Sequence, residues 1–181
     1  MSVNDELPWI SPALALIRAA AVAAVPVLGH CLGGQLMSKA LGGSVTRAAV
    51  KEIGWGAVDV LENSAAADWF GGVKSFDSFH WHGETFSIPP GATRVLASPW
   101  CENQAFVTGP HLAMQCHVEM TPDLIRAWCQ EWGNEVESIA RRVPSVQTPA
   151  QMSAGLEDKV RALNAVADRL YDRWTGGLRR D

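Results

Sequence analysis

The chain has 181 residues, of which 48% are apolar and 19% are charged, and its formal net charge is −4. This length accommodates one domain with a sizeable core, and the composition is that of a globular protein rather than a disordered or fibrous one. The acidic balance argues against nucleic acid as a partner, because phosphate binding requires clustered lysine and arginine.

The first part of the chain alternates between helix and strand. Ser11, which precedes a proline, predicts the cap of a helix over 13–24. Residues 25–28 form a short apolar run bounded by glycine, which is typical of a strand buried in a parallel sheet. A tight glycine-rich turn then leads into a helix predicted over 34–41. This order of elements indicates an α/β sheet.

The middle and the end of the chain follow a different pattern. Short β-prone segments alternate with turn signals and predict hairpins and edge strands at 53–61, 76–82, 93–98, 104–107 and 112–116. Thr121, followed by proline, predicts the cap of another helix, with Leu124, Trp128 and Trp132 facing the core. A last amphipathic helix is predicted over 153–174.

Two features bear on the cellular compartment. The apolar stretch 13–28 is too short to span a bilayer and carries a charged residue in its middle, so we expect neither a membrane span nor a signal sequence. The four cysteines (Cys31, Cys101, Cys116 and Cys129) lack CxxC spacing and are expected to be free thiols. We therefore expect a cytoplasmic protein without a membrane partner.

The segment Gly29-His30-Cys31-Leu32-Gly33 places a thiol between a predicted strand and a predicted helix. Such a turn projects the thiol from the sheet edge, and the amino end of the following helix favours its thiolate form. The backbone amide of Leu32 could then bind the oxyanion of a tetrahedral intermediate. The pattern alone is equally compatible with a buried structural cysteine.

A nucleophilic thiol needs a base, and His117 is the candidate among the five histidines. Glu119 lies two residues later, so in an extended segment both side chains project from one face. His117 could then take the proton of Cys31 while Glu119 orients the imidazole. The alternative is an incidental surface pair at the end of a strand.

Segments 26–43 and 113–123 closely resemble the two signature segments of class I glutamine amidotransferases, a G-x-C-x-G-x-Q turn and a segment that carries histidine and glutamate. Segments 79–92 and 101–106 resemble further family segments in the expected order. The resemblance runs from about residue 1 to 132. Within the family, this part of the chain is similar to the amidotransferase domain of GMP synthetase. It implies a flavodoxin-like α/β fold with a mostly parallel central sheet, flanking helices and added antiparallel hairpins.

The resemblance implies a role for each matching residue of the reaction centre. Cys31 would form a glutamyl thioester and release ammonia, with Leu32 at the oxyanion. His117 would act as general base and then as acid, and Glu119 would be its orienting partner. No cofactor is implied.

The resemblance also implies a substrate site. Gln35 would contact the substrate, and the backbone at His82 and Gly83 would hold the substrate's amino-acid end. Cys116 and Val118 replace the family's usual aromatic residue and proline. Because both flank the histidine without removing it, we expect altered packing there rather than lost chemistry.

The same resemblance predicts the domain organisation. Residues 1–143 would form the catalytic domain, and residues 144–181 a linker and a C-terminal helix for packing or for a homodimer. The family's usual first strand-helix-strand portion has no counterpart ahead of residue 1, so we expect an N-terminally truncated version of the domain. That portion supplies a second oxyanion amide, and losing one such donor can cost about a hundredfold in rate.

Three functions are compatible with these residues. The first is hydrolysis of glutamine, with ammonia passed to a synthetase subunit on a separate chain. The second is a stand-alone hydrolase of γ-glutamyl peptides or amines, and the third is a non-catalytic interaction module. A metal site built from His80 and His82, with Cys116 or His117, is a further alternative, although no third ligand has supporting spacing.

Overall fold

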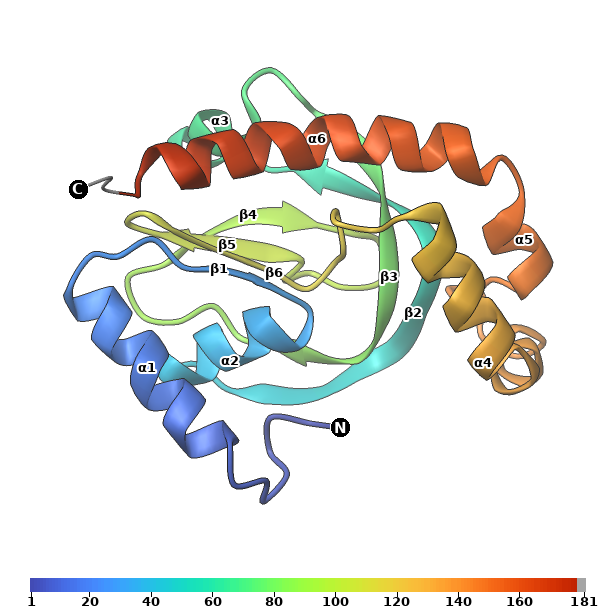
Figure 1. Cartoon of the computed structure of the whole chain (residues 1–181), viewed down its shortest axis with the longest axis horizontal. Coiled ribbons are helices and arrows are strands. Elements are labelled where there is room, and N and C mark those ends of the chain that lie inside the picture. The colour runs from blue at the N-terminus through green and yellow to red at the C-terminus, as the bar shows by residue number, and fades with distance from the viewer. Residues whose placement is uncertain (179–181) are drawn as a thin grey trace.

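The computed structural model describes residues 1–178 as a curled mixed sheet flanked by helices (Figure 1). Along the chain the described elements are α1 (Ile10–Val22), β1 (Leu28–His30), α2 (Leu32–Ala40), β2 (Val45–Val60), α3 (Ser64–Phe70), β3 (Ser75–Phe86), β4 (Thr93–Ala97), β5 (Ala105–Thr108), β6 (His111–Met114), α4 (Pro122–Ala140), α5 (Pro149–Ser153) and α6 (Leu156–Gly176). The long ribbon of β2 and β3 curves around the shorter strands, with α6 on one side and α1 and α2 on the other.

The strand order over the described residues is β1-β6-β5-β4-β2-β3. β1 pairs in parallel with β6, whereas each of the other neighbouring pairs is antiparallel. The α/β class is confirmed, but the expected mostly parallel pairing is corrected to a mixed sheet. Short connections join β4 to β5 and β5 to β6, and a short connection can join only antiparallel neighbours.

The boundaries of the first elements differ from the prediction. Helix α1 begins at Ile10, and Ser11 lies inside it rather than capping it. At the other end Ala24 has a φ of 53°, and the Val25 amide bonds back to the Ala20 carbonyl. Residues 23–25 therefore complete the end of the helix, and β1 starts only at Leu28.

Helix α4 begins as predicted but presents a different face. The Thr121 side chain accepts a hydrogen bond from the Leu124 amide, which confirms the cap. Ile125 and Val136 are the buried residues of this helix, whereas Leu124 and Trp132 are 37% and 38% exposed. The prediction that Leu124 and Trp132 face the core is therefore wrong. The short helix α3, capped by the side chain of Asn63, was not predicted from the sequence.

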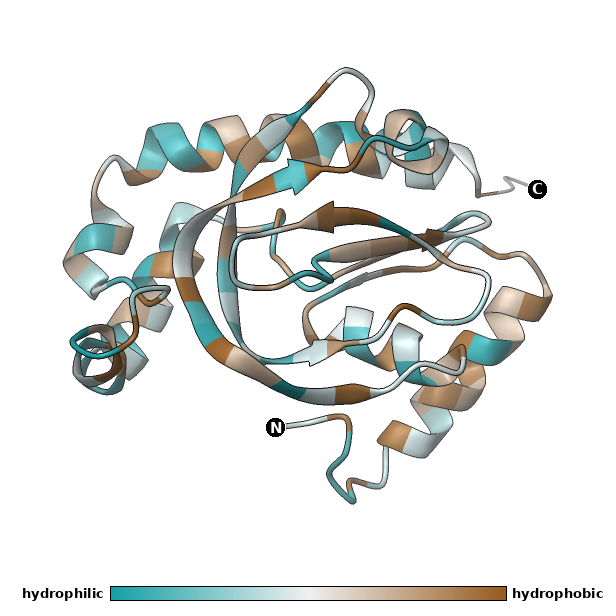
Figure 2. Cartoon of the chain, turned by 180° about the vertical axis from the view of Figure 1, so that it is seen from behind, coloured by the Kyte–Doolittle hydropathy of each residue, from teal (hydrophilic) through white to brown (hydrophobic). Residues whose placement is uncertain are grey.

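The sheet separates two apolar cores. The larger one packs α3, α4 and α6 against one face, with Phe70, Ile125 and Leu163 among its buried members. The smaller one packs α1 and α2 against the other face through Ile10 and Met37. Figure 2 shows mostly apolar residues along the inner strands and a mixture of polar and apolar residues along α6. No helix within residues 1–178 combines the length and the apolar character needed to cross a membrane.

Candidate active site

Cys31 lies in the turn between β1 and α2, with a φ of 47° and a ψ of −107°. This backbone conformation is strained for a residue with a side chain, and it persists because the surrounding chain is tightly packed. A Cβ on Gly29 would lie 2.6 Å from the Gly33 carbonyl carbon, and one on Gly34 would lie 2.5 Å from the Met114 carbonyl oxygen. The glycines therefore permit α2 to sit directly against β1 and β6.

The amino end of α2 faces the same place. Leu32 is the first residue of the helix, so its amide has no partner within the helix and carries part of the positive end of the helix dipole. The Cys31 amide donates to the Met114 carbonyl at 2.8 Å, which fastens the turn to β6. The Cys31 Sγ lies 3.7 Å from Nε2 of Gln115. The thiol therefore faces a helix amino end and a side-chain amide donor.

His117 and Glu119 follow β6 and reach the same turn. The His117 amide donates to the Phe79 carbonyl of β3 at 2.8 Å, so its backbone is fixed as an extended bridge. Its Nδ1 lies 2.5 Å from Oε1 of Glu119. Burial alone would lower the pKa of His117, but hydrogen bonding to Cys31 and to Glu119 outweighs it and raises that pKa to about 9. The three predicted side chains are thus brought together.

Aromatic rings lie beside the His117 imidazole. The Trp128 ring meets the His117 ring edge to face, with centroids 5.5 Å apart. Trp81 lies 5.1 Å from Trp128, and Trp132 lies 5.8 Å from Trp81. Trp128, which packs against the larger core as predicted, and Trp132 thus form an aromatic wall with Trp81 beside His117.

A pocket of about 850 Å³ opens in front of the thiol and is lined by Cys31, Gln35, His82 and Gly83 among others. It owes its shape to a register shift in β2 between Arg47 and Glu52, where the strand leaves its pairing with β3. Residues 48–51 in this shift form part of the pocket wall. The predicted substrate residues therefore share one cavity with the thiol.

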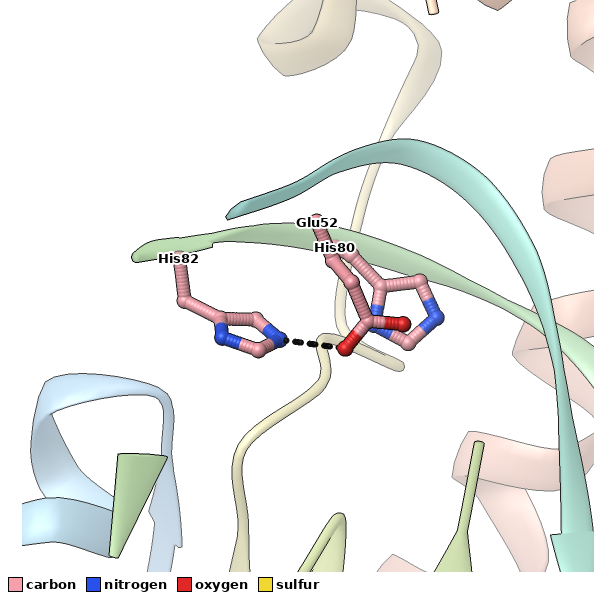
Figure 3. Close-up of side chains that lie close together, drawn as sticks. All are labelled: Glu52, His80 and His82. Atoms are coloured by element: carbon pink, nitrogen blue, oxygen red, sulfur yellow. Dashed lines mark ion pairs between the residues drawn. The ribbon is translucent and has the colours of Figure 1, made fainter. Parts of the chain in front are cut away.

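Glu52, His80 and His82 form a buried cluster, of which His82 also lines the pocket (Figure 3). Nε2 of His82 is 3.1 Å from Oε2 of Glu52, and Nδ1 of His82 is 3.1 Å from the Glu84 carbonyl oxygen. Among the described residues, the group whose ligand atoms lie close enough to hold a metal ion consists of His80, His82 and Glu52. The alternative in which Cys116 or His117 completes this ligand set is therefore wrong.

Hydrogen bonds already occupy the Glu52 carboxylate. Oε1 accepts from the Ser98 hydroxyl at 2.8 Å, and Oε2 accepts from the Gln104 amide at 2.8 Å. Burial is the main cause that lowers the pKa of His80 to about 4, so this imidazole is neutral. The cluster thus forms a hydrogen-bond network that fixes the His82 side chain and, through the Glu84 carbonyl, the wall of the pocket.

Three residues near the site were missed by sequence reasoning. Glu52 faces His82 across the β2–β3 pair, so a correct strand register would have found it. His30 stands inside the cysteine turn, and its Nδ1 lies 3.3 Å from Oε2 of Glu119. The hydroxyl of Tyr171 on α6 lies 3.1 Å from Nε2 of His30. The two residues are 141 positions apart, so no local sequence pattern could have predicted this contact.

Comparison with known proteins places these features in context. The family model described as glutamine amidotransferase class-I matches residues 4–127. A solved structure of a glutamine amido transferase from Methylobacillus flagellatus is 43% identical, covers 100% of this chain and 74% of that chain, and superposes with a TM-score of 0.96.

Two curated relatives extend the comparison. The glutamine amidotransferase-like protein YfeJ of Salmonella typhimurium is 29% identical over 159 residues, which cover 84% of this chain and 65% of that protein. A subunit of the glutamine-hydrolyzing GMP synthase of Methanococcus maripaludis is 33% identical over 123 residues, which cover 62% of this chain and 63% of that protein. The chain therefore spans less than two thirds of the length of these curated relatives.

Proposed function

The chain belongs to the class I glutamine amidotransferase family, and from this membership we propose that it hydrolyses the side-chain amide of glutamine through a thioester on Cys31. One observation carries the proposal: the Cys31 thiol stands at the amino end of α2 beside the His117–Glu119 pair. A thiol, an imidazole and an orienting carboxylate in this order are the parts that nucleophilic acyl transfer requires.

In the proposed reaction Cys31 gives its proton to His117, and the thiolate attacks the amide carbon of glutamine. The Leu32 amide donates a hydrogen bond to the resulting oxyanion. The His117 imidazolium then gives its proton to the departing nitrogen, so ammonia leaves and a γ-glutamyl thioester remains. His117 next takes a proton from water, the hydroxide attacks the thioester, and glutamate and the free Cys31 are released.

The substrate would be held by the residues that line the pocket with Cys31. Gln35 is buried, and its side-chain amide donates to Oε1 of Gln115 at 3.1 Å, so its carboxamide is held at a fixed place on the wall. We propose that Gln35 contacts the substrate and that the backbone at His82 and Gly83 binds the amino-acid end. The network behind His82 supports this assignment because it makes that backbone rigid.

A second substrate class is favoured by the size of the pocket. At about 850 Å³ it lies near the top of the range of pockets that bury drug-sized molecules, so it has room for more than glutamine. A γ-glutamyl peptide or amine would react by the same thioester chemistry, with an amine in place of ammonia as the leaving group.

The fate of ammonia and the setting of the reaction are also proposals. The relative from Methanococcus maripaludis is described as one subunit of a synthase. We infer that a separate synthetase subunit is the acceptor of ammonia from this chain as well. The four cysteines are free thiols, which suits a reducing cytoplasm. A homodimer stays a prediction that a measurement of molecular mass in solution would test.

The test is an assay for glutamate and ammonia released from glutamine by the wild-type chain and by Cys31→Ala. We expect turnover that Cys31→Ala abolishes, while the matched control Cys129→Ala, which removes another partly buried thiol, retains it. Release of methylamine from γ-glutamyl methylamide, compared with release of ammonia from glutamine, separates the two substrate classes. If no compound shows turnover that depends on Cys31, both enzymatic proposals are wrong and the non-catalytic module stands.

A further inference from the structure

The second oxygen of Glu119 has its own partner. Oε2 of Glu119 and Nδ1 of His30 lie 3.3 Å apart, and the backbone of Cys116 also approaches the His30 imidazole. The His30 side chain is only 15% exposed. The His30 imidazole is therefore placed to restrict the rotation of the Glu119 carboxylate.

The other nitrogen of His30 meets the C-terminal helix. Nε2 lies 3.1 Å from the hydroxyl of Tyr171, and the two rings meet edge to face at 83°. Tyr171 is the one tyrosine of the chain and stands on α6, which otherwise packs into the larger core. Helix α6 is thus connected to Glu119 through the side chains of Tyr171 and His30.

The positions of the protons along this series follow from the groups themselves. Burial would raise the pKa of Glu119, but the hydrogen bond from His117 outweighs it and lowers that pKa, so the carboxylate is ionised and only accepts. Burial lowers the pKa of His30, so this imidazole is neutral and carries one proton, which Glu119 draws to Nδ1. Nε2 then accepts, and the Tyr171 hydroxyl donates to it. Burial raises the pKa of Tyr171 to about 12, which keeps its proton in place.

We propose that His30 and Tyr171 are positioning residues that extend the Cys31–His117–Glu119 set and tie α6 to the reaction centre. The Tyr171 hydroxyl fixes the tautomer of His30, His30 fixes the rotation of Glu119, and Glu119 fixes the imidazole of His117. This inference rests on the proposed function. Without the contact to His30, only the hydrogen bond with His117 holds the Glu119 side chain, which is 32% exposed, so the orientation of both side chains is less firmly fixed.

The experiment compares Tyr171→Phe, His30→Leu and the double variant with the wild type. For glutamine hydrolysis we expect each single change to lower kcat about tenfold with little change in KM, because a displaced catalytic group slows the chemical step. Because Tyr171 acts through His30, the double variant should lose no more than His30→Leu alone. His30→Asn presents an amide N–H close to the position of Nδ1, so it should restore most of kcat and be insensitive to Tyr171→Phe.

A second measurement needs no turnover. The rate at which iodoacetamide alkylates Cys31 reports the thiolate, and the rate in Cys31→Ala subtracts the other thiols. A poorly oriented His117 stabilises the thiolate less, so the alkylation profile of Tyr171→Phe and of His30→Leu should shift to higher pH. If glutamine is not hydrolysed but this shift occurs, the proposed function is wrong while the positioning role stands.

The control is Leu163→Val, a buried change on α6 about 12 Å along the helix from Tyr171. It should lower the melting temperature without changing the kcat or the alkylation profile. The inference is overturned if Tyr171→Phe leaves both kcat and the alkylation profile unchanged, or if the losses in kcat of Tyr171→Phe and His30→Leu add in the double variant. It is also overturned if Leu163→Val lowers kcat as much as Tyr171→Phe does.

Discussion

Glu52 offers the sharpest test of how the pocket wall is held. Its carboxylate is 3% exposed and is approached by three groups, the Ser98 hydroxyl, the Gln104 amide and Nε2 of His82. Glu52→Gln keeps the shape of the side chain but has one accepting oxygen and adds an amide that donates. At least one of the three neighbours therefore loses its carboxylate acceptor in a buried contact.

The cost can be worked out from these contacts. A buried hydrogen bond to a charged group contributes about 1.5–3 kcal/mol, and Glu52 accepts one from Ser98 and one from Gln104. We therefore expect Glu52→Gln to lower the free energy of unfolding by about 3 kcal/mol. Because the network supports His82 and the Glu84 carbonyl, the KM for glutamine should also rise.

Urea denaturation at neutral pH measures the loss of stability, and Glu131→Gln on the exposed face of α4 is the matched control. That control should change the free energy of unfolding by no more than about 0.5 kcal/mol. The interactions with His82 and its neighbours lower the pKa of Glu52 despite its burial, so its contribution is present above its unfolded pKa and is lost as the pH falls through the folded value. The gap between wild type and Glu52→Gln should accordingly narrow in acid. A loss below about 1 kcal/mol at neutral pH would refute the reasoning.

Three further predictions follow from the turn and from the buried histidines. Gly34→Ala should destabilise the chain by about 2 kcal/mol, because its Cβ would meet the Met114 carbonyl, whereas Gly33→Ala, which meets nothing within 4 Å, should be neutral or stabilising by urea denaturation. Burial lowers the pKa of His80 to about 4, so stability should fall by about 3 kcal/mol as the pH drops from about 6.5 to 4, and His80→Asn should remove that dependence. Contact with Cys31 and Glu119 raises the pKa of His117 to about 9 despite burial, so its stabilisation is complete below its unfolded pKa and is lost as the pH rises through 9. In Cys31→Ala, unfolding measured across this alkaline range should show a smaller loss, and an unchanged loss would contradict the assignment.

The side chains of the proposed reaction centre could be identified from the sequence because their determinants are local. The turn at Cys31 needs glycines at fixed positions, and His117 and Glu119 are two residues apart, so a short stretch of sequence defines each part. The predicted strands over 93–98, 104–107 and 112–116 lie close to β4, β5 and β6, because β-prone segments and turns are local signals, whereas the prediction missed the first half of β2. Their pairing was not, because parallel or antiparallel direction depends on which strands become neighbours.

Contacts between side chains that lie far apart along the chain could not be predicted from the sequence. The periodicity of α4 gave an apolar stripe, and Trp128 does pack against the core, but Trp132 packs on Trp81 beside the site and Leu124 is partly exposed. The contact of His30 with Tyr171 depends on how α6 lies over the sheet, and a single tyrosine carries no pattern from which to read it. These contacts are set by packing, which acts between segments that a motif does not connect.

The place of Tyr171 has a consequence for how the protein is made. Its contact with His30 spans 141 positions, and contacts of such high sequence separation form late because the intervening chain must first be ordered. Synthesis proceeds from the amino end, so the cysteine turn leaves the ribosome long before α6 does. A nascent chain can therefore assemble the turn early, but Glu119 acquires its full support only when α6 has docked, which delays the mature reactivity of the thiol until the described fold is complete.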